Sequence, residues 1–216
     1  LPCHRWLVMQ PYYSDDHVTL YHARWEDVPL PKDAAVVSDP PYGMAWDVDT
    51  TRFSGGVQKV SRGKEWDLPI EGDRQPFDPT PWLDYPEVIL FGSNHFGQRL
   101  PVGTTLVWVK RNDDAFGSFL SDAEVAWMKG GYGVYCYRSI RSPGTNLHPT
   151  QKPVDLMRWV VGKTTAPTIL DPYAGSGSTL VAAKSLNRKA IGVECVERYC
   201  EVAAKRLSQE VLGLVA

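Results

Sequence analysis

Two short apolar runs in this chain end in the same kind of sequence, an acid followed by proline. Residues 34–38 lead into Asp39, residues 168–170 lead into Asp171, and a proline follows each acid. An apolar run of this length bounded by turn residues is typical of a strand buried on both faces. Such strands occur almost only in parallel sheets that helices cover on both sides. The chain is therefore expected to form an α/β sheet with two chemically distinctive loops at strand carboxyl ends.

The rest of the chain alternates strand-like and helix-like patterns, which is the signature of a mostly parallel sheet with helices on both faces. With 216 residues, 43% of them hydrophobic, the chain is large enough for one core, so a single domain over residues 1–216 is expected. Further strands are predicted at 18–21, 87–91, 105–109, 124–128 and 190–193, and helices at 153–163, 178–186 and 198–209.

A long segment, residues 47–81, follows neither period and is rich in glycine, proline and charge, so we predict an excursion loop. Loops this long in compact domains are usually functional or mobile. The formal charge of −2 does not exclude a nucleic-acid partner, because binding requires local rather than total positive charge. The basic residues considered for phosphate contacts, with ordinary solvated surface as the alternative, are Arg52, Lys59, Arg62, Lys64, Lys110, Arg111, Arg138 and Arg141.

The loop after the strand at 168–170 has the composition of a cofactor-binding loop. It runs from Asp171 through Tyr173, Gly175, Ser176 and Gly177 into a predicted helix. Glycines there let a ligand approach the backbone, at the strand ends where α/β sheets bind cofactors. No lysine follows Gly177, so the loop is not a P-loop, and Leu180 replaces the third glycine of a dinucleotide fingerprint.

An acid on the neighbouring strand strengthens this interpretation. Glu194 ends the next predicted strand, about twenty residues on, where a carboxylate can hold ribose hydroxyls. Without Glu194, a simple strand-to-helix turn would remain a reasonable alternative. A cofactor with a ribose but no pyrophosphate is favoured.

The loop after the strand at 34–38 reads Asp39-Pro40-Pro41-Tyr42. Two prolines fix the backbone and remove two N–H donors, which leaves carbonyl groups free to accept hydrogen bonds. An acid, a rigid carbonyl and an aromatic ring suit a planar base that carries an amino group. A proline turn with incidental neighbours is the structural alternative.

Together the two loops resemble the catalytic and cofactor motifs of amino-group DNA methyltransferases. Residues 148–153, His-Pro-Thr-Gln-Lys-Pro, resemble a third motif of that family, which packs against the methionine end of the cofactor. The order, catalytic motif first, matches the permuted β group, and the chain looks most like small phage and prophage enzymes. The resemblance implies a Rossmann-like methyltransferase sheet with a circularly permuted motif order.

The resemblance also implies the site and the chemistry. Asp39 and the Pro40 carbonyl would accept the two hydrogens of the target amino group, and Tyr42 would stack on a base flipped out of the duplex. No covalent intermediate and no metal are needed. The implied catalytic residues are Asp39, Pro40, Pro41 and Tyr42, and the implied S-adenosylmethionine-binding residues are Asp171, Tyr173, Gly175, Ser176, Gly177, Glu194, Thr150 and Lys152.

Two departures from the family pattern carry consequences. The first predicted strand ends in His22-Ala23-Arg24 where the family has Gly-Asp, whose acid reads the cofactor adenine. Asp27 substitutes for that acid, or packing alone holds the adenine. Room for a separate recognition domain is also lacking, so DNA specificity would fall to the short segment 130–147 and to the 47–81 loop.

Several alternatives stay open at this point. Asp39 favours adenine, because N4-cytosine enzymes usually carry serine there; a glutamine or RNA methyltransferase would place the cofactor motif first. A cytosine-C5 enzyme requires a cysteine beside proline at a strand end, which none of the four cysteines provides. A non-catalytic DNA-binding homologue is the remaining class. Apolar runs are too short to span a bilayer, so a cytoplasmic, DNA-bound protein is expected, with a homodimer left open.

Overall fold

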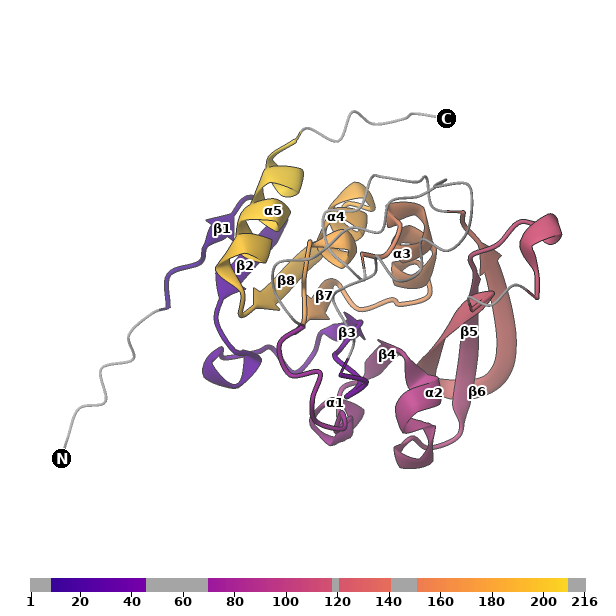
Figure 1. Ribbon diagram of the computed structural model, residues 1–216. Helices are drawn as coiled ribbons and strands as arrows, with labels where there is room; N and C mark the ends of the chain where they lie inside the picture. Colours follow the sequence, from indigo (N-terminus) through magenta and orange to yellow (C-terminus); the bar gives the residue numbers. More distant parts are fainter. Residues whose placement is uncertain (1–8, 46–69, 118–120, 141–150, 210–216) are drawn as a thin grey trace.

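The computed structural model describes residues 9–45, 70–117, 121–140 and 151–209. These residues form an eight-stranded sheet with helices on both faces (Figure 1). The strands lie in the order β1-β2-β8-β7-β3-β4-β6-β5. The α/β fold expected from the sequence is therefore confirmed, and within the described residues no helix is long and apolar enough to cross a bilayer.

The elements follow the predicted alternation closely. The strands are β1 (Tyr13–Ser14), β2 (Val18–His22), β3 (Ala35–Ser38), β4 (Glu87–Phe91), β5 (Gly103–Val109), β6 (Ala123–Arg138), β7 (Thr168–Asp171) and β8 (Lys189–Glu194). The α-helices are α1 (Thr80–Leu83), α2 (Ser93–Phe96), α3 (Val154–Val161), α4 (Ser178–Ser185) and α5 (Glu197–Ser208), with short 3-10 turns η1 (Trp25–Asp27), η3 (Gly97–Arg99) and η4 (Asp113–Ala115).

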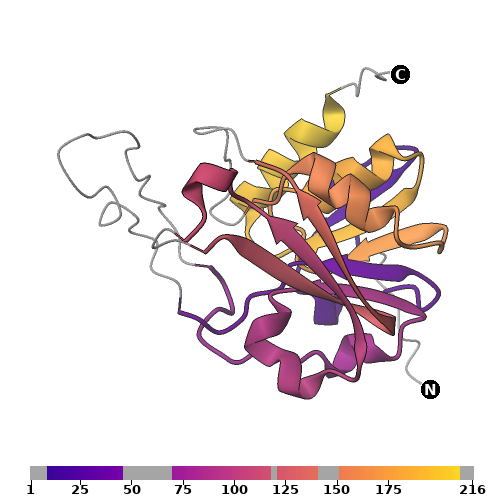
Figure 2. The ribbon, with the colours of Figure 1, turned by 90° about the vertical axis from the view of Figure 1, so that its right-hand side faces the viewer.

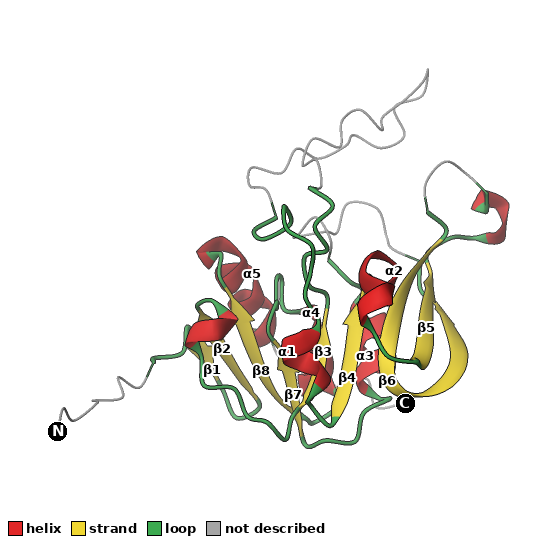
Figure 3. Ribbon diagram, turned by 90° about the horizontal axis from the view of Figure 1, so that it is seen from below, coloured by secondary structure: helices red, strands yellow, loops and turns green. Residues whose placement is uncertain are grey.

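The centre of the sheet consists of five parallel strands, β2, β8, β7, β3 and β4. Val36 in β3 is in register with Leu170 in β7 on one side and with Val88 in β4 on the other. Because parallel strands end at the same edge, the loops that follow β3, β7 and β8 emerge side by side. Figure 3 shows these strands side by side, following one another across the view from β2 to β4.

One edge of the sheet is built differently from the prediction. The first part of β6 pairs antiparallel with β4 and β5, and Gly130 and Gly131 then turn the chain with positive φ angles. Residues 134–138 return along the other side of β5, in parallel register with it. The predicted strand at 124–128 therefore continues beyond its glycines, and most of the described part of segment 130–147 is sheet rather than a free loop (Figure 2).

The core has two layers, because residues of the central strands alternate between the two faces of the sheet. Val37, Ile89 and Phe91 pack with α3, α4 and α5, whereas Val36 and Leu90 pack with α1 and α2 on the opposite face. All of these side chains are at most 1% exposed. Burial on both faces explains why these strands are continuously apolar in sequence.

Truncation of a side chain in the second layer tests its importance for folding. Leu90→Ala is expected to lower the free energy of unfolding by about 2–5 kcal/mol, because it removes buried methyl groups and leaves a cavity. Val102→Ala is the control, since Val102 is 83% exposed and its truncation should change stability little. Urea unfolding measures both, and equal stabilities of the two variants would contradict the assignment of Leu90 to the core.

Candidate functional site

The Asp39 loop and the glycine loop are adjacent and hydrogen bonded. β3 ends at Ser38, whose hydroxyl donates to Asp171 Oδ1 at 2.6 Å. Asp171, the last residue of β7, also accepts a hydrogen bond from the Tyr173 amide at 3.2 Å. Both Ser38 and Asp171 are buried, so this contact fixes the two loops relative to each other.

The Asp39 loop is anchored a second time by the segment that precedes α1. Asp73 is buried, and its Oδ1 accepts hydrogen bonds from the amides of Gly43 at 2.9 Å and Met44 at 3.1 Å. Asp73 lies within the predicted 47–81 loop, whose residues 47–69 lie outside the described residues and whose last residues begin α1. A lone acid in an irregular segment gave no sequence signal for this role.

Glu194 is held against the glycine loop by backbone donors. Its Oε2 accepts from the Gly175 amide and its Oε1 from the Val196 amide, both at 2.8 Å. Gly175 has a φ of +50°, a conformation that favours glycine. The Glu194 carboxylate at the end of β8 thus lies beside the glycine loop that follows β7, as the sequence spacing predicted.

Gly177 has a packing role that the sequence did not indicate, while its expected contact with a ligand stays a prediction. Its φ is +77°, and a Cβ there would lie 2.9 Å from Cβ of Ala203 in α5. Glycine is therefore required for the close approach of α5 to the start of α4. Arg206 of α5 reinforces this contact by donating to the Ser176 carbonyl at 2.5 Å and to the Ser176 hydroxyl at 3.0 Å.

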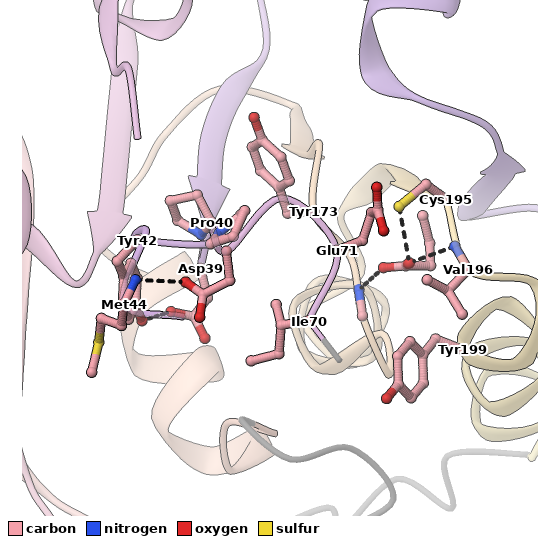
Figure 4. A pocket seen from close by; sticks show the side chains of 14 residues that line it. Asp39, Pro40, Tyr42, Met44, Ile70, Glu71, Tyr173, Cys195, Val196 and Tyr199 are labelled. Atoms are coloured by element: carbon pink, nitrogen blue, oxygen red, sulfur yellow. Dashed lines mark hydrogen bonds between the residues drawn. The ribbon is translucent and has the colours of Figure 1, made fainter. Parts of the chain in front are cut away.

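The two loops line one cavity that is open to solvent on one side and has about 690 Å³ of empty space, solvent at its mouth included. Figure 4 shows Asp39, Pro40 and Tyr42 on one side of it, with Cys195, Val196 and Tyr199 across from them and Tyr173 between. Glu194 and Gly175 also line this cavity. A smaller cavity beside it is lined by Asp39, Lys152, Asp171, Gly175 and Ser176. The predicted catalytic and cofactor residues that are described therefore converge on one region.

A second cleft, of about 1070 Å³, adjoins the first and shares Glu194, Tyr173 and Cys195 with it. The end of β2 forms one wall, where Arg24 and Glu26 make an ion pair at 3.8 Å. Asp27, the predicted substitute for the family's missing acid, is exposed and is not among the residues that line this cleft. Glu26, the neighbour of Asp27 in the sequence, does line the cleft, together with the acids Glu71, Asp78 and Glu194.

Lys152, which was predicted to bind the cofactor, contacts Asp39 of the predicted catalytic loop. Its ammonium group forms an ion pair with Asp39 and another, at 3.1 Å, with Glu124. The side chain of Lys152 is only 5% exposed. Glu124 was not predicted as a site residue; an acid at the start of an apolar strand is the only sequence signal that could have indicated it. Thr150, the neighbouring predicted residue, lies outside the described residues.

Tyr42 is already engaged on its ring and on its hydroxyl. The ring stacks on His95, with centroids 5.0 Å apart and planes 5° from parallel, and the hydroxyl donates to Asp39 Oδ1. Gly92 packs so closely against the ring that a Cβ at that position would overlap it. His95 therefore occupies one face of the Tyr42 ring, and Tyr42 also lines the cavity.

The residues predicted to contact DNA are largely outside the described part of the chain. Arg52, Lys59, Arg62, Lys64 and Arg141 lie in residues 46–69 and 141–150. Arg138 is described at the end of β6, where it forms an ion pair with Asp113 at 2.8 Å and is 47% exposed. The phosphate contacts stay a prediction. Among the described residues, no group of three or more histidine, cysteine, aspartate or glutamate side chains could hold a metal ion.

Comparison with known proteins gives sequence matches over part of the chain. Residues 123–205 match the N6_N4_Mtase family, described as "DNA methylase". The type II methyltransferase M.BglII of Bacillus subtilis is 38% identical over 81 residues, which are 36% of this chain and 22% of that protein. M2.DpnII of Streptococcus pneumoniae is 45% identical over 65 residues, 29% of this chain and 24% of that protein. The chain thus spans about a quarter of the length of these relatives.

Solved structures match nearly the whole chain. The M1.HpyAVI complex with S-adenosylmethionine (SAM) has a TM-score of 0.56 at 21% identity, covering 88% of this chain and 99% of that one. The cytosine-N4-specific PvuII DNA methyltransferase has a TM-score of 0.61 at 13% identity, covering 95% and 91%. The chain therefore shares the fold of these solved structures. At these identities the likeness concerns the fold alone.

Burial of Asp171 predicts a pH-dependent stability. Desolvation raises the pKa of Asp171 to about 6, although Ser38 and Thr179 donate to it. A raised carboxyl pKa stabilises the fold at low pH, and this contribution is lost as the pH rises from about 4 through about 6, amounting to about 3 kcal/mol. Asp171→Asn should remove this part of the pH dependence in urea unfolding between pH 4 and pH 8.

The matched control is Asp84→Asn, because Asp84 is exposed and is distant in sequence from both the Asp39 loop and the glycine loop. That variant should follow the wild-type stability at every pH. A constant difference between wild type and Asp171→Asn from pH 4 to pH 8 would contradict the raised pKa.

Proposed function

We propose that this chain transfers a methyl group from SAM to the exocyclic amino group of a base in DNA, with adenine N6 as the target. The observation that carries the proposal is the common cavity of Asp39 and Glu194. It brings a hydrogen-bond-accepting loop suited to an amino group beside an acid suited to a ribose. The match of residues 123–205 to the DNA methylase family supports the same chemistry.

The residues around the cavity fit SAM. Both oxygens of Glu194 accept backbone N–H groups and retain lone pairs that can accept ribose hydroxyls. Gly175 presents backbone without a side chain at the same wall. SAM supplies, when bound, an electrophilic methyl group, and the remaining chemistry concerns this chain's own residues.

The Asp39 loop would prepare the amino nitrogen for methylation. An exocyclic amine is a weak nucleophile, because its lone pair is delocalised into the ring. The Asp39 carboxylate and the Pro40 carbonyl accept its two hydrogens and draw the nitrogen toward tetrahedral geometry. These acceptors are held in place before the base arrives, by Asp73 and by the Ser38–Asp171 hydrogen bond, which is the condition for electrostatic preorganisation.

The base must leave the duplex to reach this cavity, at a cost of a few kcal/mol of unstacking. Stacking of the flipped base on Tyr42, which lines the cavity, would compensate part of that cost. Adenine is favoured over cytosine because the first position of the loop is Asp39 and not serine. Phosphate contacts by the basic residues of the 47–81 loop, the permuted motif order and a homodimer belong to the same proposal.

Replacement of Asp39 tests the proposal most simply. Asp39→Ala and Asp39→Asn are expected to reduce the rate of methyl transfer by on the order of 10²–10³-fold, because each removes a preorganised charge at the reacting nitrogen. Transfer of labelled methyl groups to duplex DNA measures the rate. Nucleoside mass spectrometry identifies the product, with N6-methyladenine expected. Sole formation of N4-methylcytosine would overturn the choice of base, and full activity of Asp39→Ala would overturn the site.

Replacement of Glu194 tests the cofactor half of the same site. Glu194→Gln should weaken SAM binding by about 10- to 100-fold, because a charged hydrogen-bond acceptor worth about 1.5–3 kcal/mol is lost. Isothermal titration calorimetry measures the affinity. Glu197→Gln, an exposed acid three residues along the chain, is the control and should bind SAM as the wild type does. Equal affinities of the two variants would remove Glu194 from the cofactor site.

A further inference from the structure

A row of four charged side chains lies next to the base-binding end of the cavity. They come from separate parts of the chain, and each contacts the next. The order of contacts is Lys110, which follows β5, Glu124 in β6, Lys152 just before α3, and Asp39 after β3.

The geometry makes Lys152 a cation shared by two acids. Its Nζ contacts Asp39 Oδ2 and lies 3.1 Å from Glu124 Oε2. Glu124 in turn uses its other oxygen, Oε1, to accept from Lys110 Nζ at 3.0 Å. Lys152 is 5% exposed, whereas Glu124 and Lys110 are 31% and 24% exposed, so the row runs from solvent into the site.

Each charged side chain in this row shifts the pKa of its neighbours. Burial alone would lower the pKa of Lys152, but Asp39 and Glu124 raise it above its usual value. Burial also raises the pKa of Asp39, with Lys152 opposing that rise and Glu124 adding to it. For Glu124, Lys152 and Lys110 overcome the effect of burial and lower the pKa to about 2. Lys152 and Glu124 are therefore ionised at neutral pH.

The sharing of Lys152 between two acids matters because Asp39 must accept a hydrogen bond from the neutral amino group of the base. A carboxylate that is paired with a single buried ammonium group forms a strong, charge-assisted hydrogen bond with it. The amino group of the base would then have to compete with the ammonium group for the same carboxylate oxygen. A second carboxylate on the ammonium group weakens this competition. It also provides an acceptor to which the ammonium group can move without being left unpaired in a buried place.

We propose that Glu124 is a positioning residue, which holds Lys152 so that Asp39 stays available to the target amino group. On arrival of the base, Lys152 moves toward Glu124 and the Oδ2 atom of Asp39 accepts the amino hydrogen. Lys110 limits this movement by neutralising Glu124 from the solvent side. The inference rests on the proposed function for its catalytic consequence, but the shared lysine exists independently of it.

Other titratable groups also surround Asp39 and enter its pH dependence. Tyr42 donates to Oδ1, and Asp171 lies across the Ser38 contact. The groups that face Asp39, Lys152 or Tyr42 from the packed elements are Tyr42, Asp73, His95, Glu124 and Asp171, and Lys110 acts on them through its ion pair with Glu124.

Glu124→Gln is the main test. Its kcat for methyl transfer should fall by up to about 10²-fold, as expected for a misplaced catalytic group, while the KM for SAM stays unchanged. The acid limb of the kcat profile should move to lower pH, because loss of the Glu124 charge lowers the pKa at which Asp39 gains a proton. Loss of rate with an unmoved acid limb would make Glu124 merely structural and would overturn the proposal.

Two further variants are compared with Glu124→Gln: one should have an intermediate rate, and the other should shift the acid limb in the opposite direction. Glu124→Asp retains the charge and should leave the acid limb in place while restoring part of the rate. Lys110→Met should move the acid limb to higher pH, since Glu124 is then free to draw Lys152 from Asp39. Movement of the limb in the same direction in Lys110→Met and Glu124→Gln would contradict the shared-lysine arrangement.

A measurement without SAM or DNA separates this inference from the proposed function. Nitrogen NMR of the labelled lysine ammonium groups, with Lys152→Met identifying the signal, reports how fast Lys152 exchanges hydrogens with water. Exchange should be slow in the wild type and faster in Glu124→Gln, which has lost one acceptor. Equal exchange in the two proteins would overturn the role of Glu124. Absence of methyl transfer in a wild type with slow exchange would instead overturn the proposed function.

Discussion

The parallel pairing of β3 with β7 is the constraint on which the candidate site depends. Ala35 is in register with Ile169 and Val36 with Leu170, so the two strands end together although 133 residues separate Ser38 from Asp171. The Ser38–Asp171 hydrogen bond then fixes the loops that follow. With β8 on the other side of β7, Glu194 reaches the same place. Three segments distant in sequence thus form one cavity, because parallel strands end at one edge of a sheet.

Buried charge is the second constraint, and it explains features that packing alone does not. Asp39, Asp171 and Glu194 all lie at the carboxyl edge, where burial raises the pKa of each. Each is stabilised in a different way: Asp39 by an ammonium group, Asp171 by hydroxyl and amide donors, and Glu194 by two backbone amides. Such arrangements are costly for folding and are typical of functional sites.

The sequence predicted the fold well, because the buried central strands are continuously apolar and the helices that follow them have clear boundaries. The predicted strand at 87–91 and the helices at 153–163, 178–186 and 198–209 lie within about two residues of the observed elements. The return strand at 134–138 was missed; three consecutive residues of it, Val134, Tyr135 and Cys136, are exposed at the sheet edge, and only Tyr137 packs against the core. The convergence of Asp39, Glu194 and Gly175 followed from strand order.

Contacts that depend on side-chain direction could not be predicted. Lys152 was assigned to the cofactor, yet its ammonium group lies on Asp39 and Glu124, since the segment before α3 approaches β6. Gly177 was assigned to ligand space, and the packing of α5, which excludes a side chain there, was not foreseen. Asp27 was considered for the cofactor adenine, yet η1 directs Glu26 and not Asp27 into the second cleft. In each case the residue type was informative and the partner was decided by tertiary packing.

A crystal structure of the full chain with S-adenosylhomocysteine and duplex DNA would test the central claim most directly. We expect a flipped adenine whose amino nitrogen lies about 3 Å from a carboxylate oxygen of Asp39. We also expect the ribose hydroxyls of the ligand on Glu194 and the Lys152 ammonium group closer to Glu124 than to Asp39. A base bound away from Asp39, or a ligand bound outside the cavity of Asp39 and Glu194, would contradict the account.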